Sequence, residues 1–172
     1  MCVKIGSNGN CIYLWADKKI MEQVAAFAHF YAQGIEKISE ELRNFHHEDE
    51  IWKVTGDISN SAGNLTLHLV GNLNHFIGAQ LGKTGYVRDR EHEFVSRDVH
   101  RDVLIRMVDE TKVMTEKILN SLETEDLVKI YPLNTFGEGK TIGYVLIMML
   151  GHLNYHLGQI NYLRRFFSPT SL

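Results

Sequence analysis

Apolar residues recur at steps of three and four along most of the chain, which is the period of an amphipathic helix. Proline, which interrupts helices, occurs only at Pro132 and Pro169. The pattern predicts four long helices that each turn one apolar face toward a shared core. Four such helices favour an all-α four-helix bundle, with long connections after the second and third helices.

The first two predicted helices lie in the N-terminal half of the chain. Asp17 is the expected N-cap of the first helix, which we expect to end near Asn44. Ser61 or Asn60 is the expected N-cap of the second, which runs to about Gly82.

A charged loop over residues 83–94 separates the second helix from the third. Ser96 or Asp98 is the expected cap of the third helix, which ends near Ser121. Capping residues are favoured because their side chains bind backbone N–H groups that the helix itself leaves unpaired.

The last helix follows a second long connection, residues 123–140, in which residues 127–131 can be extended. Thr141 is its expected N-cap, and it ends near Phe167, before Pro169.

We predict a single domain. A chain of 172 residues is long enough to bury one core. Residues 1–16 are interpreted as an irregular N-terminal extension, residues 17–167 as the bundle and residues 168–172 as a C-terminal tail.

Composition narrows the classes of function. The net charge of -3 and the lack of a basic stripe argue against nucleic acid as a partner. Cys2 and Cys11 both lie in the N-terminal stretch, so a disulfide framework and a thiolate zinc site are excluded. The longest apolar run, residues 142–150, is far shorter than the roughly 20 residues that span a bilayer. With no signal peptide evident, a cytoplasmic protein without a membrane partner is expected.

Candidate chemistry centres on His152 and His156 in the last helix. Residues four apart leave one helix face about a turn apart, so these two neutral imidazoles can hold one divalent metal ion. The same face otherwise consists of core residues, and buried rings can instead be satisfied by groups across the bundle. An unpaired buried donor or acceptor costs roughly 1 to 3 kcal/mol. On spacing alone, the packing interpretation is favoured.

The bundle changes this balance, because ligands from facing helices converge in its core. Catalytic zinc-type sites use three protein ligands and leave one position open. His68, in the middle of the second helix among apolar residues, is the best third ligand, and His75 is the second choice. The other histidines are expected at the surface or at helix ends: His29, His46, His47, His92 and His100. With His68 opposite the pair, metal binding becomes the favoured interpretation.

Polar residues near these histidines are candidates to orient a ring or a substrate, with interhelical hydrogen bonding as an equal alternative. They are Asn72, Asn154, Tyr155 and Gln159. Gln159 is the strongest, since it lies one turn beyond His156. Arg88 and Arg90 could close over the pocket mouth to bind an anionic thiol or a carboxylate. A surface salt-bridge network is the favoured interpretation of these arginines.

Other metal and nucleotide classes lack their motifs. Leu153 stands where the metalloprotease motif His-Glu-x-x-His has its glutamate. The paired Glu-x-x-His motifs of di-iron bundles, a Cys-x-x-Cys-His haem motif and a phosphate-binding Gly-x-x-x-x-Gly-Lys loop are absent.

Three features together resemble the DinB-like superfamily of bacillithiol- and mycothiol-transferase-type bundles. They are the segment His152-x-x-x-His156-x-Gly158-Gln159, the segment Leu67-His68-Leu69 and the order of the four helices. The resemblance covers about residues 17–167. Residues 67–73 followed by residues 85–94 look like one branch of this superfamily.

The resemblance implies that His68, His152 and His156 hold zinc, nickel or a similar dication in an open pocket, and that the protein forms homodimers. Characterised relatives include S-transferases that use a low-molecular-weight thiol such as bacillithiol or mycothiol, and a thiol-dependent isomerase. A dication held by neutral histidines would present a bound thiol as a thiolate to an electrophile. We therefore expect a metal-dependent thiol S-transferase. A metal-dependent hydrolase at the same centre and a non-catalytic dimeric stress-associated binding protein are the alternatives.

Overall fold

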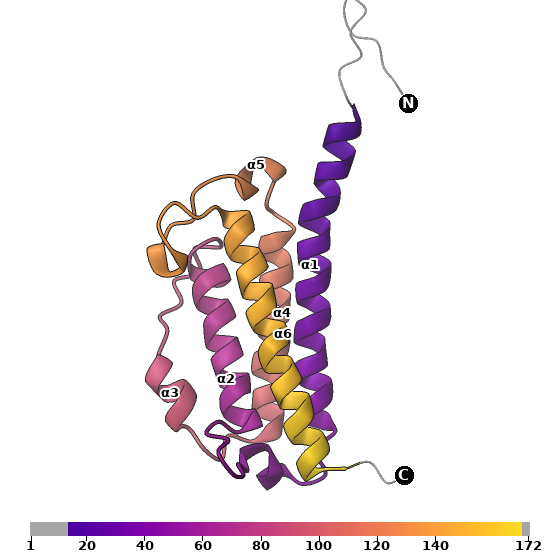
Figure 1. Cartoon of the computed structure of the whole chain (residues 1–172), viewed down its shortest axis with the longest axis vertical. Coiled ribbons are helices and arrows are strands. Elements are labelled where there is room, and N and C mark those ends of the chain that lie inside the picture. Colours follow the sequence, from indigo (N-terminus) through magenta and orange to yellow (C-terminus); the bar gives the residue numbers. More distant parts are fainter. Residues whose placement is uncertain (1–13, 170–172) are drawn as a thin grey trace, which may run out of the picture.

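The computed structural model describes residues 14–169, and in this range four long helices form an all-α bundle (Figure 1). The long helices are α1 (Leu14–Arg43), α2 (Ala62–Leu73), α4 (Arg101–Leu119) and α6 (Ile142–Phe167). Helices α1 and α6 run in one direction and α2 and α4 in the other (Figure 1). The predicted fold class is thus confirmed. Cys2 and Cys11 lie outside the described residues.

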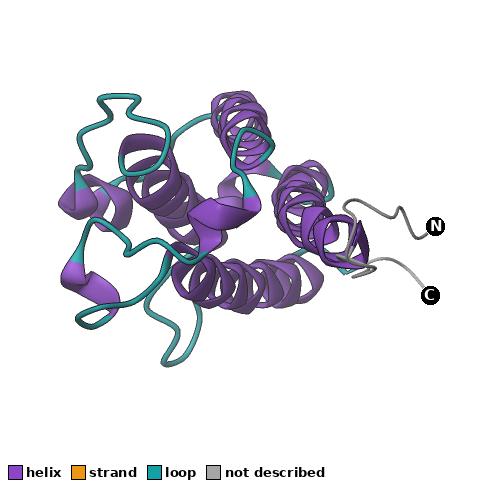
Figure 2. Ribbon diagram, turned by 90° about the horizontal axis from the view of Figure 1, so that it is seen from above, coloured by secondary structure: helices purple, strands orange, loops and turns teal. Residues whose placement is uncertain are grey.

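Shorter helical elements occupy the connections (Figure 2). They are η1 (Glu48–Trp52), the π-helix η2 (Asn74–Ala79), α3 (Arg90–Val95), α5 (Thr124–Leu127) and η3 (Asn134–Phe136). The loop expected over residues 83–94 was therefore wrong in its second half, because Asp89 accepts a hydrogen bond from the His92 N–H and starts α3. Extended backbone in the second connection is limited to one antiparallel bridge, between Ile130 and Thr141.

Two of the predicted caps are confirmed. The Ser61 hydroxyl accepts from the Asn64 N–H at 3.1 Å, and the Thr141 hydroxyl accepts from the Tyr144 N–H at 3.2 Å. The prediction for Asp17 was wrong, because α1 begins at Leu14 and Asp17 lies within the helix.

The prediction for the start of the third long helix was also wrong. Ser96 ends α3, since its N–H donates to the His92 carbonyl, and Asp98 takes a left-handed conformation with φ of 60°. The N-cap of α4 is His100. A sequence-based boundary placed the cap too early because it took no account of α3.

The second helix changes character before its expected end. At Asn74 the α-helix widens into η2, which ends at Ala79 rather than at Gly82. Gly82 still closes the last turn, since its N–H donates to the Ile77 carbonyl at 3.0 Å. A Cβ at Gly82 would lie 2.2 Å from a side-chain carbon of Ile118, so α4 packs directly on this glycine.

Every residue of helix α2 is buried. The helix packs against α3, α4 and α6, while α1 packs against α4 and α6. The Tyr31 hydroxyl donates to the Leu146 carbonyl at 2.8 Å and ties α1 to α6. Polar residues of α2 must therefore find partners inside the protein. No helix within residues 14–169 is both long enough and apolar enough to cross a membrane.

Candidate metal centre

Three imidazoles converge where α2 faces α6. The Nε2 atom of His68 lies 3.3 Å from Nε2 of His152, and Nε2 of His156 lies 3.1 Å from the same atom. One nitrogen from each ring falls within 4.8 Å of the other two. Helix spacing brings His152 and His156 together, and packing of the two helices adds His68. We call these three residues the histidine triad.

Two rings of the triad have their proton placed by a neighbour. His68 Nδ1 lies 2.9 Å from a carboxylate oxygen of Glu93, and His156 Nδ1 lies 2.6 Å from the amide oxygen of Gln159. Both oxygens can only accept, so each Nδ1 is the donor. In the neutral rings, the Nε2 lone pairs of His68 and His156 then point toward His152.

His152 cannot satisfy both neighbours. A proton on its Nε2 serves only one of the two lone pairs. A proton on Nδ1 serves neither, since Nδ1 is buried and has no hydrogen-bond partner among residues 14–169. Burial, followed by the proximity of His156 and His68, lowers the pKa of His152 to about 4. Burial also lowers the pKa of His156. Three imidazole rings whose Nε2 atoms converge fit a divalent cation.

A buried charge pair supports His68 from the opposite side. Glu93 accepts from Arg88 Nε at 2.6 Å and from Arg88 Nη2 at 2.8 Å, while one of its oxygens also accepts from His68. Burial alone would raise the pKa of Glu93, but hydrogen bonds from Arg88 and His68 outweigh it, so the pKa lies below its usual value. Glu93 is therefore an ionised carboxylate at neutral pH.

One face of α2 holds α3 in place. The Asn64 amide donates to the backbone carbonyls of Glu93 and Ser96, each at 3.1 Å. Gly71 leaves room for the Glu93 side chain, since a Cβ there would lie 2.1 Å from its carboxylate. Asn64, His68 and Gly71 are spaced by four and three residues and so lie along one side of the helix.

The other predicted residues take different places. Gln159 contacts His156, and the exposed Tyr155 ring packs edge-on against His156, with ring centroids 5.1 Å apart. Asn154 is exposed, and its amide donates to the Leu150 carbonyl of its own helix. Asn72 is buried, and its side-chain oxygen has no hydrogen-bond partner in the part of the chain that the structure describes.

His75 does not join the triad. Burial, followed by the charge of Arg88, lowers its pKa. The histidines expected at the surface are all exposed: His29, His46, His47, His92 and His100.

The two arginines behave differently from each other. Arg88 is mostly buried and bound to Glu93, so it forms neither a surface network nor a free anion-binding group. Arg90 is exposed and lies over the Phe94 ring, 5.4 Å from its centre. The favoured surface interpretation thus fails for Arg88, because the connection folds inward at α3.

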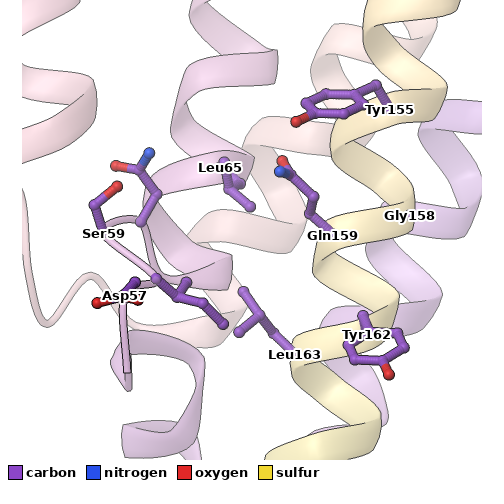
Figure 3. Close-up of a pocket in the computed structure, with 10 residues that line it drawn as sticks. Asp57, Ser59, Leu65, Tyr155, Gly158, Gln159, Tyr162 and Leu163 are labelled. Carbon is purple, nitrogen blue, oxygen red and sulfur yellow. The ribbon is translucent and has the colours of Figure 1, made fainter. Parts of the chain in front are cut away.

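A cavity of about 540 Å³ lies between α6 and the segment before α2 (Figure 3), and two of its lining residues, Tyr155 and Gln159, contact His156. Its polar lining on one wall comes from Asp57, Ser59 and Asn60, and Leu65 of α2 also lines it. Gln159 lines the opposite wall and also binds His156, so it links the cavity to the triad.

Glu93 and Asn64 are the residues of this centre that sequence reasoning missed. Glu93 lies 25 positions after His68, within a run of alternating charges that is typical of an exposed loop. One signal was available: a glycine inside a helix destabilises it, so Gly71 indicates a close approach by another group.

Comparison with known proteins places the chain in a family. The sequence model of the family described as Protein of unknown function (DUF1572) matches residues 20–171. The match includes the whole triad and the Glu93–Arg88 pair. Neither the search of curated proteins nor the search of solved structures found a match. The chain belongs to the DUF1572 family.

Proposed function

We propose that this protein is a DinB-like metal-dependent enzyme, in which His68, His152 and His156 hold one divalent transition metal ion such as zinc or nickel. The observation that carries the proposal is the convergence of the Nε2 atoms, with the two outer rings held by Glu93 and Gln159. Three protein ligands leave a position for a small molecule.

The proposed reaction is transfer of a low-molecular-weight thiol, such as bacillithiol or mycothiol, to an electrophilic carbon. The ion would supply the positive charge that lowers the pKa of the thiol. The thiol would release its proton to solvent, and the sulfur would form a bond to carbon as the leaving group departs with its electron pair. Neutral imidazoles suit this chemistry because they leave the charge of the cation uncompensated.

The cavity beside the triad is the proposed entry for the organic substrate. Leu65 from α2 and Leu163 from α6 contribute apolar side chains to its lining. Such a surface suits the carbon skeleton of an electrophile. Gln159 lies at the junction between this cavity and His156, and thus both orients the ring and borders the substrate.

A thiol screen tests the proposal. Metal-loaded and metal-free protein are compared by thermal melting with bacillithiol, mycothiol and glutathione, and then for conversion of an alkyl halide. We expect one thiol to raise the melting temperature of the metal-loaded form only, with metal- and thiol-dependent turnover. His156→Ala is the matched control and should lose both effects. Turnover that needs metal but no thiol would assign a hydrolase instead. A metal-loaded protein that neither binds a thiol nor turns over would contradict an enzymatic role.

A further inference from the structure

We propose that Glu93 is a positioning residue of the metal centre, which holds His68 in one orientation with its proton on Nδ1. Helix α3 serves to bring this carboxylate to the back of the ring. The inference rests on the proposed function, because it concerns how the Nε2 atom of His68 is presented to the metal.

The contact between the two side chains is closed to water. His68 is 7% exposed and Glu93 is 4% exposed. A hydrogen bond between buried groups is not weakened by competing solvent, and the charge on the carboxylate strengthens it. Rotation of the imidazole would break this bond and leave a buried charge with one partner fewer, so a single orientation is strongly favoured.

Arg88 offsets the free-energy cost of burying the charged Glu93 carboxylate. Two of its nitrogens donate to the two oxygens of Glu93, and this fork matches the planar carboxylate. Arg88 Nη2 also lies 3.3 Å from His68 Nδ1, but both nitrogens are donors when Glu93 accepts from the ring. Glu93 is therefore the shared acceptor for Arg88 and His68.

The helix that carries His68 is shaped to receive Glu93. Asn64, one turn before His68, fixes the backbone of Glu93, and Gly71, about one turn after, leaves space for its carboxylate. A glycine inside a helix costs about 1 kcal/mol relative to alanine. Two separate features of α2 thus place one carboxylate against one ring nitrogen.

A carboxylate behind a ligating imidazole increases the electron-donor strength of the ring, and loss of such a partner typically weakens metal affinity about 10–100-fold. Glu93 should act on the metal only through His68, since its oxygens are engaged by His68 and Arg88.

Glu93→Gln tests the inference with little change in shape, and Glu91→Gln, on the exposed side of α3, is the matched control. Zn²⁺ affinity is measured by competition with a chelator, and the Co²⁺-loaded protein is measured by visible absorption. We expect Glu93→Gln to bind Zn²⁺ about 10–100-fold more weakly and to shift the Co²⁺ bands, with Glu91→Gln matching the wild type. Wild-type affinity and an unchanged spectrum in Glu93→Gln would overturn the inference.

Two further measurements separate positioning from folding. Glu93→Asp keeps the charge but withdraws it by one methylene, and it should show the same weakening if Glu93→Gln fails to fold. In the metal-free protein, nitrogen-15 spectra should show the His68 proton on Nδ1 in the wild type and a loss of this preference in Glu93→Gln. A wild type that binds neither Zn²⁺ nor Co²⁺ would refute the proposed function. Normal binding in both Glu93 variants would refute only the role of Glu93.

Discussion

The two sides of the histidine triad are held in different ways. On α2, His68 is buried and bound by an ionised carboxylate, which Arg88 compensates. On α6, His152 and His156 are half-buried, and within the described part of the chain their one side-chain hydrogen bond outside the triad joins His156 to the neutral amide of Gln159. The α2 side depends on charged residues from the connection between α2 and α4. The α6 side depends on residues about one turn apart in a single helix.

This difference indicates where the centre should be rigid and where it should be open. The α2 side is covered by α3, and His68 and Glu93 are both buried there. The α6 side borders the cavity that Gln159 lines. A ligand fixed by buried charge beside ligands next to a cavity suits a centre that must hold its metal and still admit a substrate.

The largest expected effect follows removal of a triad ring from either side. His68→Ala and His156→Ala should each reduce bound metal from about one ion per chain to below about a tenth, because two imidazoles remain. Elemental analysis measures this loss, with helical content by circular dichroism as the control. His68→Ala should also lower the free energy of unfolding of the metal-free protein by about 1–3 kcal/mol more than His156→Ala, because it removes a partner from the buried Glu93. Equal stabilities would contradict the proposed asymmetry.

Gly71→Ala should disturb the α2 side of the triad without removing a polar group. The added Cβ would push Glu93 away from His68, and overpacking of this kind costs about 1–3 kcal/mol. Zn²⁺ affinity should fall about tenfold or more. Gly151→Ala is the control, because its Cβ meets open space and it should raise stability by about 0.5–1 kcal/mol. If Gly71→Ala were as stable as Gly151→Ala and bound Zn²⁺ as tightly, α3 would not be fixed as described.

Gln159→Leu, on the α6 side, should lower Zn²⁺ affinity by less than the changes on the α2 side. It removes the acceptor for His156 Nδ1 but no charge, so we expect Zn²⁺ affinity to fall about tenfold, at the lower end for such partners. Asn154→Ala, which removes an exposed amide bound only within α6, should leave the affinity unchanged. A larger loss of Zn²⁺ affinity in Gln159→Leu than in Glu93→Gln would contradict the expectation that the α2 side contributes more than the α6 side.

The smallest effect is the pH dependence of the metal-free protein. An unfolded histidine binds its proton near pH 6.5, whereas the pKa of folded His152 is about 4. The unfolded state therefore holds more protons between these values, and stability must fall as the pH drops from about 6.5 to about 4. The contribution is on the order of 1 kcal/mol because the ring is partly exposed. Urea unfolding of wild type and His152→Gln checks this: the variant should show a flatter profile, and identical profiles would contradict the assignment.

Local patterns predicted most of the fold. The caps at Ser61 and Thr141 follow from residue type beside an apolar repeat, and both are found. Asp17 and Asp98 have equally suitable side chains, yet neither caps a helix. The start of α4 depends on α3, whose position is set by tertiary hydrogen bonds to Asn64 rather than by its own sequence.

Part of the candidate site was likewise predictable from local sequence, and part depends on tertiary contacts. His152 and His156 follow from helix spacing, and burial of α2 points to His68 as their partner. Glu93 resembles any exposed acidic residue until α3 docks, because its burial comes from contacts 5 to 29 positions away, with Arg88 and Asn64. Gly71 was the sign of that contact in the local sequence, since a glycine inside a helix lowers the stability of the helix.

X-ray absorption at the metal edge of tag-free protein, loaded with one equivalent of Zn²⁺, tests the central claim most directly. The account predicts one tightly held ion per chain with three imidazole nitrogens at about 2.0–2.1 Å, and fewer imidazoles in His68→Ala. Protein that retains no ion, or an ion surrounded by oxygen ligands with the same spectrum in His68→Ala, would contradict it.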